Sequence, residues 1–171
     1  MKAAIAFVNK SNAGNTVLAL LERGSVQGHH AASVGVPVEM ETLFQVASLS
    51  KWISAWGVMA LAEDGKINLD APVSTYLKRW ALPKSEYDTD RVTARRLLSH
   101  TAGLTDGLGY AGFPPGTPVQ TLEESLAHTA DVSPGASGVV RVGIEPGSKW
   151  EYSGGGYALL QLLVEEVSGG P

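Results

Sequence analysis

The chain has 171 residues, of which 44% are apolar and 18% are charged, and its formal net charge is −4. This composition fits a folded globular chain and excludes a disordered one. The mild acidic balance, with no run of basic residues, argues against nucleic acid or an anionic membrane as the main partner. The absence of cysteine excludes disulfides, thiolate metal sites and cysteine nucleophiles, and it leaves the cellular compartment open.

The first part of the chain is expected to form strands. Two apolar runs, residues 3–8 and 16–24, flank the turn-rich string KSNAGN, so we predict a β-hairpin between them. The string SVQGHHAASVG, residues 25–35, would add a third strand. No apolar run reaches the roughly 20 residues that a membrane-spanning helix needs, so we expect no membrane span.

From Ser48 to about Glu63 the pattern changes to that of a helix, with apolar residues on more than one face and Gly65 where a helix commonly stops. A helix that is apolar on so many sides is expected to be buried. A last helix is predicted from Tyr157 to about Val167, ahead of a pair of glycines. Between these two helices, further helix starts are expected at Asp70, at Thr93 and at a capping box of Thr121 with Glu124.

With strands in residues 1–47 and helices in residues 48–171, we expect a single α/β (α+β) domain. Two or three strands form a sheet too small to have its apolar face and edges covered. The final string VSGGP is typical of a helix that has stopped and a turn that begins. We therefore expect residues 1–171 to be an incomplete domain that a C-terminal segment or a second chain completes.

Ser48 and Lys51, in the string ASLSK, are candidates for a nucleophile and its base. The pair by itself is weak, because composition alone yields about 0.6 serine and lysine pairs at this spacing. Residues three apart share a helix face, and a serine in the first turn lies near free backbone N–H groups and the positive end of the helix dipole. The alternative is that Ser48 only caps the helix and Lys51 is a solvated side chain.

Tyr152 is the candidate for a third group at the same site. It follows a Pro-Gly turn and precedes a glycine run that leads into the last helix. Such a position presents a side chain at a cleft. The alternative is an ordinary tyrosine that buries its ring and leaves its hydroxyl in water.

Four blocks, taken in order, decide between these alternatives: LFQVASLSK, LAEDGKINLDAPVSTYL, VTARRLLSHTAGL and IEPGSKWEYSGGGYALLQLLVEEVSGG. Together they resemble the serine β-lactamase and penicillin-recognising enzyme superfamily, in particular its branch of class C β-lactamases, esterases and D-amino-acid peptidases. The resemblance implies an antiparallel sheet flanked by helices, a helical subdomain and C-terminal strands that this chain lacks.

The resemblance also implies an acyl-enzyme mechanism. Ser48 would be the nucleophile, and its backbone N–H would be one oxyanion donor. Lys51 would help to remove its proton, and Tyr152 would relay a proton to the leaving group and later activate water. The implied substrates are β-lactams, small esters or D-amino-acid peptides.

The chain departs from the family pattern in three ways. Gly154 stands where the second motif usually has an asparagine, whose amide contacts the lysine and the substrate carbonyl. The third motif, a lysine or histidine followed by a small residue and glycine, is absent. The family also has a helix before its first strand, whereas the strand expected at residues 3–8 leaves no room for one. An alternative is therefore a non-catalytic member or fragment that binds peptidoglycan-like ligands or a completing partner chain.

No cofactor or metal is expected. The string GLGYAG at residues 107–112 matches a dinucleotide fingerprint but has no strand before it and no helix after it. The histidines lack metal-ligand spacing. His100 lies in a block that is structural in the family, so the resemblance implies a turn-stabilising role. Family members are commonly periplasmic or secreted, but no signal peptide is visible, so the localisation stays open.

Overall fold

The computed structural model describes residues 1–39, 41–108 and 112–170. The chain divides into two compact units, Met1–Val46 and Ala47–Pro171. The first unit contains α1 (Lys2–Ser11), β1 (Thr16–Glu22) and β2 (Ser25–Ala32). The second contains η1 (Ala47–Ser50), α2 (Lys51–Glu63), η2 (Val73–Thr75), η3 (Thr89–Arg91), α3 (Ala94–Leu98), α4 (Leu122–His128) and α5 (Gly154–Ser168), where η marks a short 3-10 helix.

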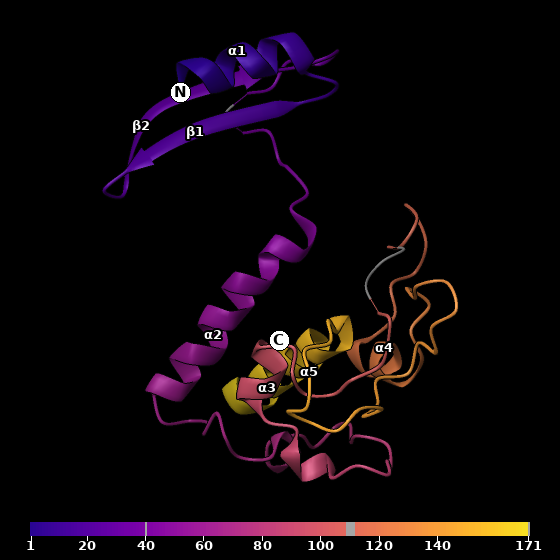
Figure 1. Ribbon diagram of the computed structural model, residues 1–171. Helices are drawn as coiled ribbons and strands as arrows, with labels where there is room; N and C mark the ends of the chain where they lie inside the picture. The colour runs from indigo at the N-terminus through magenta and orange to yellow at the C-terminus, as the bar shows by residue number, and fades with distance from the viewer. Residues whose placement is uncertain (40, 109–111, 171) are drawn as a thin grey trace. The chain divides into compact units, whose positions relative to one another are not determined.

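In the first unit, β1 and β2 form an antiparallel hairpin (Figure 1). A two-residue turn joins them, with φ of 50° at Arg23 and 78° at Gly24. Positive φ at both central residues matches the right-handed twist of the paired strands, which is why such turns are favoured in hairpins. The pairing runs from Thr16 opposite Ala32 to Glu22 opposite Ser25. The strand expected after residue 24 is therefore present as β2.

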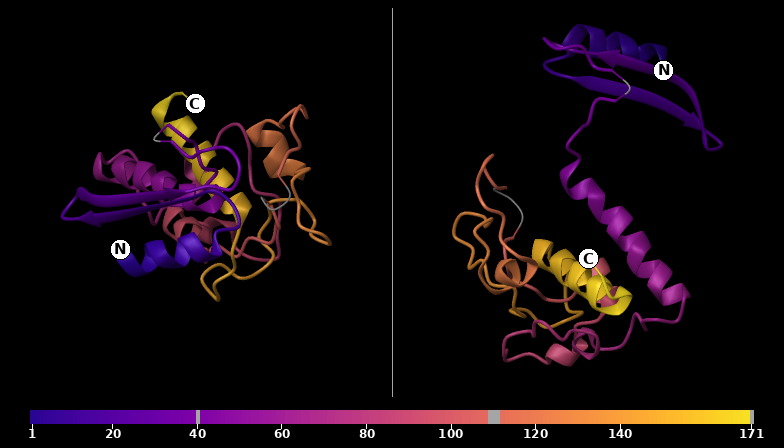
Figure 2. Two further views of the ribbon diagram at one scale, coloured as in Figure 1. Left: turned by 90° about the horizontal axis from the view of Figure 1, so that it is seen from above. Right: turned by 180° about the vertical axis from the view of Figure 1, so that it is seen from behind.

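The strand predicted at residues 3–8 was wrong, because this segment belongs to helix α1. The sequence KAAIAFVNKS lacks strict alternation of apolar and polar residues, and its alanines favour a helix. The tight turn at Gly24 pairs β1 with the segment that follows it and not with the one before. The helix that the family has before its first strand is therefore present. It lies along the hairpin in Figure 1 and in the right view of Figure 2.

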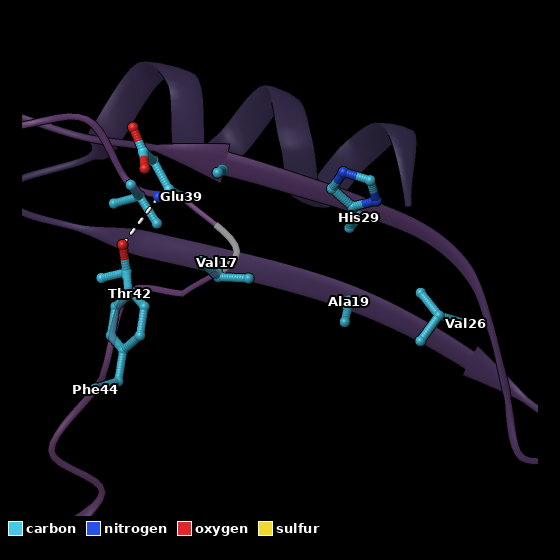
Figure 3. A pocket seen from close by; sticks show the side chains of 9 residues that line it. Val17, Ala19, Val26, His29, Glu39, Thr42 and Phe44 are labelled. Carbon is cyan, nitrogen blue, oxygen red and sulfur yellow. Dashed lines mark hydrogen bonds between the residues drawn. The ribbon is translucent and has the colours of Figure 1, made fainter.

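The hairpin carries a hollow of about 510 Å³ (Figure 3). Its polar edge holds a hydrogen bond of 2.9 Å from the backbone N–H of Glu39 to the hydroxyl of Thr42. Most of its lining is apolar, from both strands and the segment after them, and includes Val17, Ala19, Val26, Ala31, Val38 and Phe44.

In the second unit, α5 contacts α2, α3 and α4 and forms the centre of the core (Figure 1). Its leucines at positions 159, 160, 162 and 163 are fully buried. The helix begins at a cap in which the hydroxyl of Ser153 accepts a hydrogen bond from the backbone N–H of Gly156. It ends at Gly169, whose φ of 79° is the left-handed conformation that stops many helices.

The helix expected from Ser48 is present as a 3-10 turn followed by α2, but the expected burial of α2 was wrong. Only Val58 and Leu61 are buried, whereas Trp52 and Trp56 are 55% and 69% exposed. The physical reason is that α2 packs mainly against one helix, α5, so much of its surface is left uncovered in this unit.

Two of the three helix starts expected between these helices are confirmed. Thr93 caps α3 through a hydrogen bond from the backbone N–H of Arg96, and Thr121 caps α4 with a complete capping box. The start expected at Asp70 was wrong, because the chain stays extended at Pro72 and then forms only η2. The Asp70 carboxylate instead accepts two hydrogen bonds from the Arg95 guanidinium, at 2.7 and 2.8 Å.

Candidate active site

The turn η1 places Ser48 directly before helix α2. Lys51 is the first residue of α2, so the two side chains are one helical turn apart. The helix cap position is Ser50, which makes no side-chain cap hydrogen bond. Ala47 has a φ of 45°, which is unfavourable for a residue with a side chain. Ser48 is therefore not the cap of α2, and it follows a strained residue of the kind that clusters at functional sites.

The side chains of Ser48, Lys51 and Tyr152 meet at their polar ends. The oxygens of Ser48 and Tyr152 share a hydrogen bond of 2.8 Å, although the residues are 104 positions apart in sequence. The Nζ atom of Lys51 donates a hydrogen bond of 3.2 Å to Oγ of Ser48. The serine hydroxyl therefore accepts a hydrogen bond from Lys51 and shares another with the hydroxyl of Tyr152.

Lys51 also stands over two aromatic rings. Its Nζ atom lies 5.3 Å from the ring centre of Tyr152 and 5.4 Å from that of Tyr157. These distances allow cation–π attraction, which holds the ammonium in place beside Ser48. The hydroxyl of Tyr157 points elsewhere and donates a hydrogen bond of 3.3 Å to the backbone oxygen of Leu98.

The charge of Lys51 acts on Tyr152. Burial alone raises the pKa of the Tyr152 hydroxyl, but hydrogen bonds with Lys51 and Ser48 and the positive charge of Lys51 outweigh it. The pKa of Tyr152 is therefore lowered from its usual range. The pKa of Tyr157 is raised by burial and by the neighbouring Tyr152. The pKa values of the two tyrosines next to Lys51 thus shift in opposite directions, and Tyr152 loses its proton more readily than Tyr157.

A buried carboxylate fixes the backbone that carries Tyr152. Asp106 is 2% exposed and accepts hydrogen bonds from the Ser153 hydroxyl at 2.5 Å and from the backbone N–H of Gly155 at 3.1 Å. It also accepts from the backbone N–H of Leu108 at 2.9 Å. The carboxylate thus satisfies two donors at the start of α5, where the helix dipole favours a negative charge. Tyr152 directly precedes this anchored cap.

His100 lies against the same segment. Its ring centre is 4.6 Å from that of Tyr152, at an angle of 34° between the planes. Its Nδ1 atom accepts a hydrogen bond of 3.2 Å from the backbone N–H of Ser153, and its backbone oxygen accepts one of 2.8 Å from Glu151. His100 has a φ of 55°, so it sits at a turn, as the resemblance implied.

Gly154 has no space for a side chain. A Cβ atom built there would overlap the carbonyl oxygen of Leu108. The chain segment after Asp106 therefore occupies the place from which an asparagine amide would start. In the part of the chain that the structure describes, the Lys51 ammonium is held by Ser48 and the two tyrosines instead.

We expect the change Gly154→Ala to lower the free energy of unfolding by about 1–3 kcal/mol, because the added methyl group forces a backbone shift. The control is Gly57→Ala in α2, where an added Cβ meets nothing within 4 Å. Alanine favours a helix interior over glycine, so the control should be neutral or stabilising. Thermal or denaturant unfolding of both variants checks this, and equal stabilities would contradict the crowding at Gly154.

A polar pocket of about 450 Å³ opens beside Tyr152. Arg141 and Glu151 contribute charged side chains to it, and Glu151 is paired with Lys149 at 3.0 Å. The remaining lining is made of small and polar residues from the neighbouring loops, including Thr105, Asp106, Gly107, Ser133 and Ser137. Tyr152 is itself one of the lining residues, so the pocket adjoins the cluster of Ser48, Lys51 and Tyr152.

The three predicted site residues are thus brought together, whereas three residues of their supporting network were missed. Asp106 and Ser153 were not singled out, and His100 was assigned only to a turn. The signal for Ser153 was present, because a serine directly before a helix of the pattern GGGYALL is a common cap. Asp106 was missed because two of its three donors, the Ser153 hydroxyl and the Gly155 N–H, come from a segment distant in sequence. The third, the N–H of Leu108, is a local turn contact that any surface aspartate could make.

Residues 1–39, 41–108 and 112–170 contain no group of three or more histidine, aspartate or glutamate side chains able to hold a metal ion. No helix in these ranges has the length and apolar character required to cross a membrane. The string at residues 107–112 that matched a dinucleotide fingerprint lies partly outside the described residues.

The fold has close relatives among solved structures. The octameric penicillin-binding protein homologue from Pyrococcus abyssi matches with a TM-score of 0.71 and 27% sequence identity, covering 99% of this chain and 39% of that one. The expected β-lactamase/transpeptidase-like class of fold, with helices and a small antiparallel sheet, is therefore confirmed.

The sequence relatives identify the family. A family model described as Beta-lactamase matches residues 3–171, so the chain belongs to the Beta-lactamase family. Penicillin-binding protein 4* of Bacillus subtilis is 33% identical over 165 residues, covering 94% of this chain and 34% of that protein. Esterase EstB of Burkholderia gladioli is 32% identical over 157 residues, covering 85% of this chain and 37% of that protein. The chain thus spans about a third of the length of these relatives.

Proposed function

We propose that this chain carries the nucleophile, the base and the proton relay of a serine acyl hydrolase. The observation that supports the proposal most directly is the contact of three side chains from two distant segments. The hydroxyl of Ser48 is hydrogen-bonded to that of Tyr152 at 2.8 Å and to the ammonium of Lys51 at 3.2 Å. A serine that only capped a helix would need neither partner. The family match and the similarity to an esterase and a penicillin-binding protein point to the same class of reaction.

In the proposed acylation step, Oγ of Ser48 attacks the carbonyl carbon of an ester, amide or β-lactam. A new bond forms between Oγ and that carbon, and the bond from the carbon to its leaving oxygen or nitrogen breaks. The serine proton passes to the pair formed by Lys51 and Tyr152. Tyr152, whose lowered pKa favours the ionised form, accepts that proton and delivers it to the leaving group.

Deacylation reverses these roles. A water molecule gives one proton to Tyr152 and attacks the acyl carbon, the bond from that carbon to Oγ of Ser48 breaks, and the serine recovers a proton through the same pair. One water is consumed for each acyl group released, and the site returns to its starting protonation. The proton transfers in these steps, for an ester or an amide substrate, use the side chains of Ser48, Lys51 and Tyr152.

The substrate range that we propose is small esters and D-amino-acid peptides alongside β-lactams. Gly154 affects this substrate range, because it has no side-chain amide to contact the carbonyl of a β-lactam or peptide. Esters depend less on such a contact than peptides do, since an ester carbonyl is more reactive than that of an unstrained amide. We therefore rank ester hydrolysis ahead of peptide hydrolysis among the activities of the site.

The test is the intact mass of the protein before and after exposure to a fluorophosphonate, which reacts covalently with activated serines. We expect a single adduct that maps to Ser48 by peptide mass analysis. The change Ser48→Ala should remove the adduct, whereas the matched control Ser50→Ala should keep it, because Ser50 makes no side-chain cap bond. A wild-type protein that gains no adduct, or gains one elsewhere, would favour a ligand-binding role over hydrolysis.

A further inference from the structure

His100 belongs to a turn, but its imidazole ring also contacts the side chains of Tyr152 and Tyr157 and the backbone of Ser153. Its ring centre lies 4.6 Å from that of Tyr152 and 5.3 Å from that of Tyr157, at interplanar angles of 34° and 37°. A third ring, Trp150, meets it edge to face at 5.9 Å. These contacts place the imidazole against the ring of the tyrosine whose hydroxyl is hydrogen-bonded to Ser48.

The hydrogen bond at Nδ1 defines the state of the ring. The donor is the backbone N–H of Ser153, so Nδ1 must carry a lone pair and the single ring proton must be on Nε2. An imidazolium has no lone pair at either nitrogen. Ser153 is 4% exposed, so water has little access to its N–H if His100 becomes protonated. A buried donor without an acceptor is unfavourable.

The surroundings favour the neutral ring. The titratable groups that face it are Lys51 from α2, Asp106 from the loop before α4, and the two tyrosines 152 and 157. Burial lowers the pKa of His100, the positive charge of Lys51 lowers it further, and the negative charge of Asp106 opposes them. The pKa of His100 therefore lies below its usual value of about 6.5.

We propose that His100 is a positioning residue for Tyr152: its neutral ring holds the Ser153 backbone through Nδ1 and packs against the tyrosine ring, and protonation removes the hydrogen bond. This inference rests on the proposed function, in which Tyr152 relays protons at Ser48. It adds a pH limit to that function. As the pH falls through the titration of His100, Ser153 loses its acceptor and the hydroxyl of Tyr152 is no longer fixed at Ser48.

The backbone at His100 provides matched variants. Its φ of 55° is tolerated by asparagine and glycine, so neither change adds backbone strain. In His100→Asn, the amide oxygen stands close to the place of Nδ1 and accepts the Ser153 N–H at every pH. In His100→Gly, that acceptor is lost. Comparing the two variants separates the hydrogen bond from the conformation of the turn.

The first measurement is the rate of fluorophosphonate labelling of Ser48. At about pH 8 we expect His100→Asn to label within a few-fold of wild type and His100→Gly to label about tenfold more slowly or worse. Equal losses in both variants, at unchanged melting temperature, would overturn the role of the hydrogen bond.

The second measurement is the ratio of the wild-type rate to the His100→Asn rate between about pH 5 and 8. Any pH dependence common to both proteins cancels in this ratio. We expect the ratio to be flat at the upper end and to fall on the acid side, in step with protonation of His100. A constant ratio over the whole range would overturn the proposal.

The third measurement needs no activity. Nitrogen chemical shifts of the His100 ring, recorded by NMR on the intact chain, should show a neutral ring with the proton on Nε2 at about pH 7.5. A proton on Nδ1, or an imidazolium at that pH, would overturn the proposal. If wild-type Ser48 does not label at all while the ring has the expected tautomer, it is the proposed function that fails and the hydrogen bond that stands.

Discussion

Replacing Lys51 by alanine is expected to slow the acylation of Ser48 by about 10³-fold, because the change removes a group of the pair that takes the serine proton. The ammonium also sits over the rings of Tyr152 and Tyr157, so its loss removes the charge that lowers the pKa of Tyr152. The rate of fluorophosphonate labelling, with the adduct mapped to Ser48, measures the loss.

The fold should change little in this variant, since Lys51 is half-buried at the start of α2 and alanine is a good helix former. The matched control is Lys66→Ala, which removes a surface lysine whose ion pair with Asp64 spans 3.2 Å. That control should label at the wild-type rate. A Lys51→Ala protein that melts like wild type and still acylates at the normal rate would remove Lys51 from the mechanism.

The change Asp106→Ala is expected to reduce the free energy of unfolding by about 3 kcal/mol or more. It leaves three donors without their acceptor in a part of the protein that water reaches poorly: the hydroxyl of Ser153 and the backbone N–H groups of Leu108 and Gly155. Chemical denaturation followed by circular dichroism measures the loss. We also expect slower labelling of Ser48, because the cap next to Tyr152 is no longer anchored.

A second substitution distinguishes the charge from the hydrogen bonds. Asp106→Asn keeps an oxygen for the two backbone donors and removes the negative charge at the start of α5, so it should fall between wild type and Asp106→Ala. The surface control is Asp64→Ala, whose carboxylate is 60% exposed and makes one ion pair. If Asp106→Ala were as stable as this control, the proposed anchoring of the Tyr152 segment would be wrong.

Several parts of the fold followed from the sequence because their causes are local. The helix over residues 51–63, the cap at Thr93 and the capping box at Thr121 each depend on side chains within four residues of one another. Residues 3–8 show the opposite case. Their apolar run is compatible with a strand or a helix, and the pairing of β1 with β2 decided that the run is not part of the sheet.

The candidate site divides in the same way. The spacing of Ser48 and Lys51 and the turn before Tyr152 could be read from the chain, and the ordered family blocks gave them a shared chemistry. Their contact could not be derived from spacing, because Ser48 and Tyr152 are 104 positions apart and the packing of α5 against α2 brings them together. The lack of space for a side chain at Gly154 likewise comes from the carbonyl of Leu108, which is a neighbour in space and not in sequence.

The family and the helix that follows Ser48 could be read from the sequence, and Ser48, Lys51 and Tyr152 could be proposed from it as the reacting side chains. Tertiary structure alone decided the partners that hold them: Asp106 as the buried acceptor at the start of α5, and His100 as the ring beside Tyr152. The physical reason is that a helix or a cap is stabilised by neighbours along the chain, whereas a buried hydrogen bond needs donors that folding brings from distant segments.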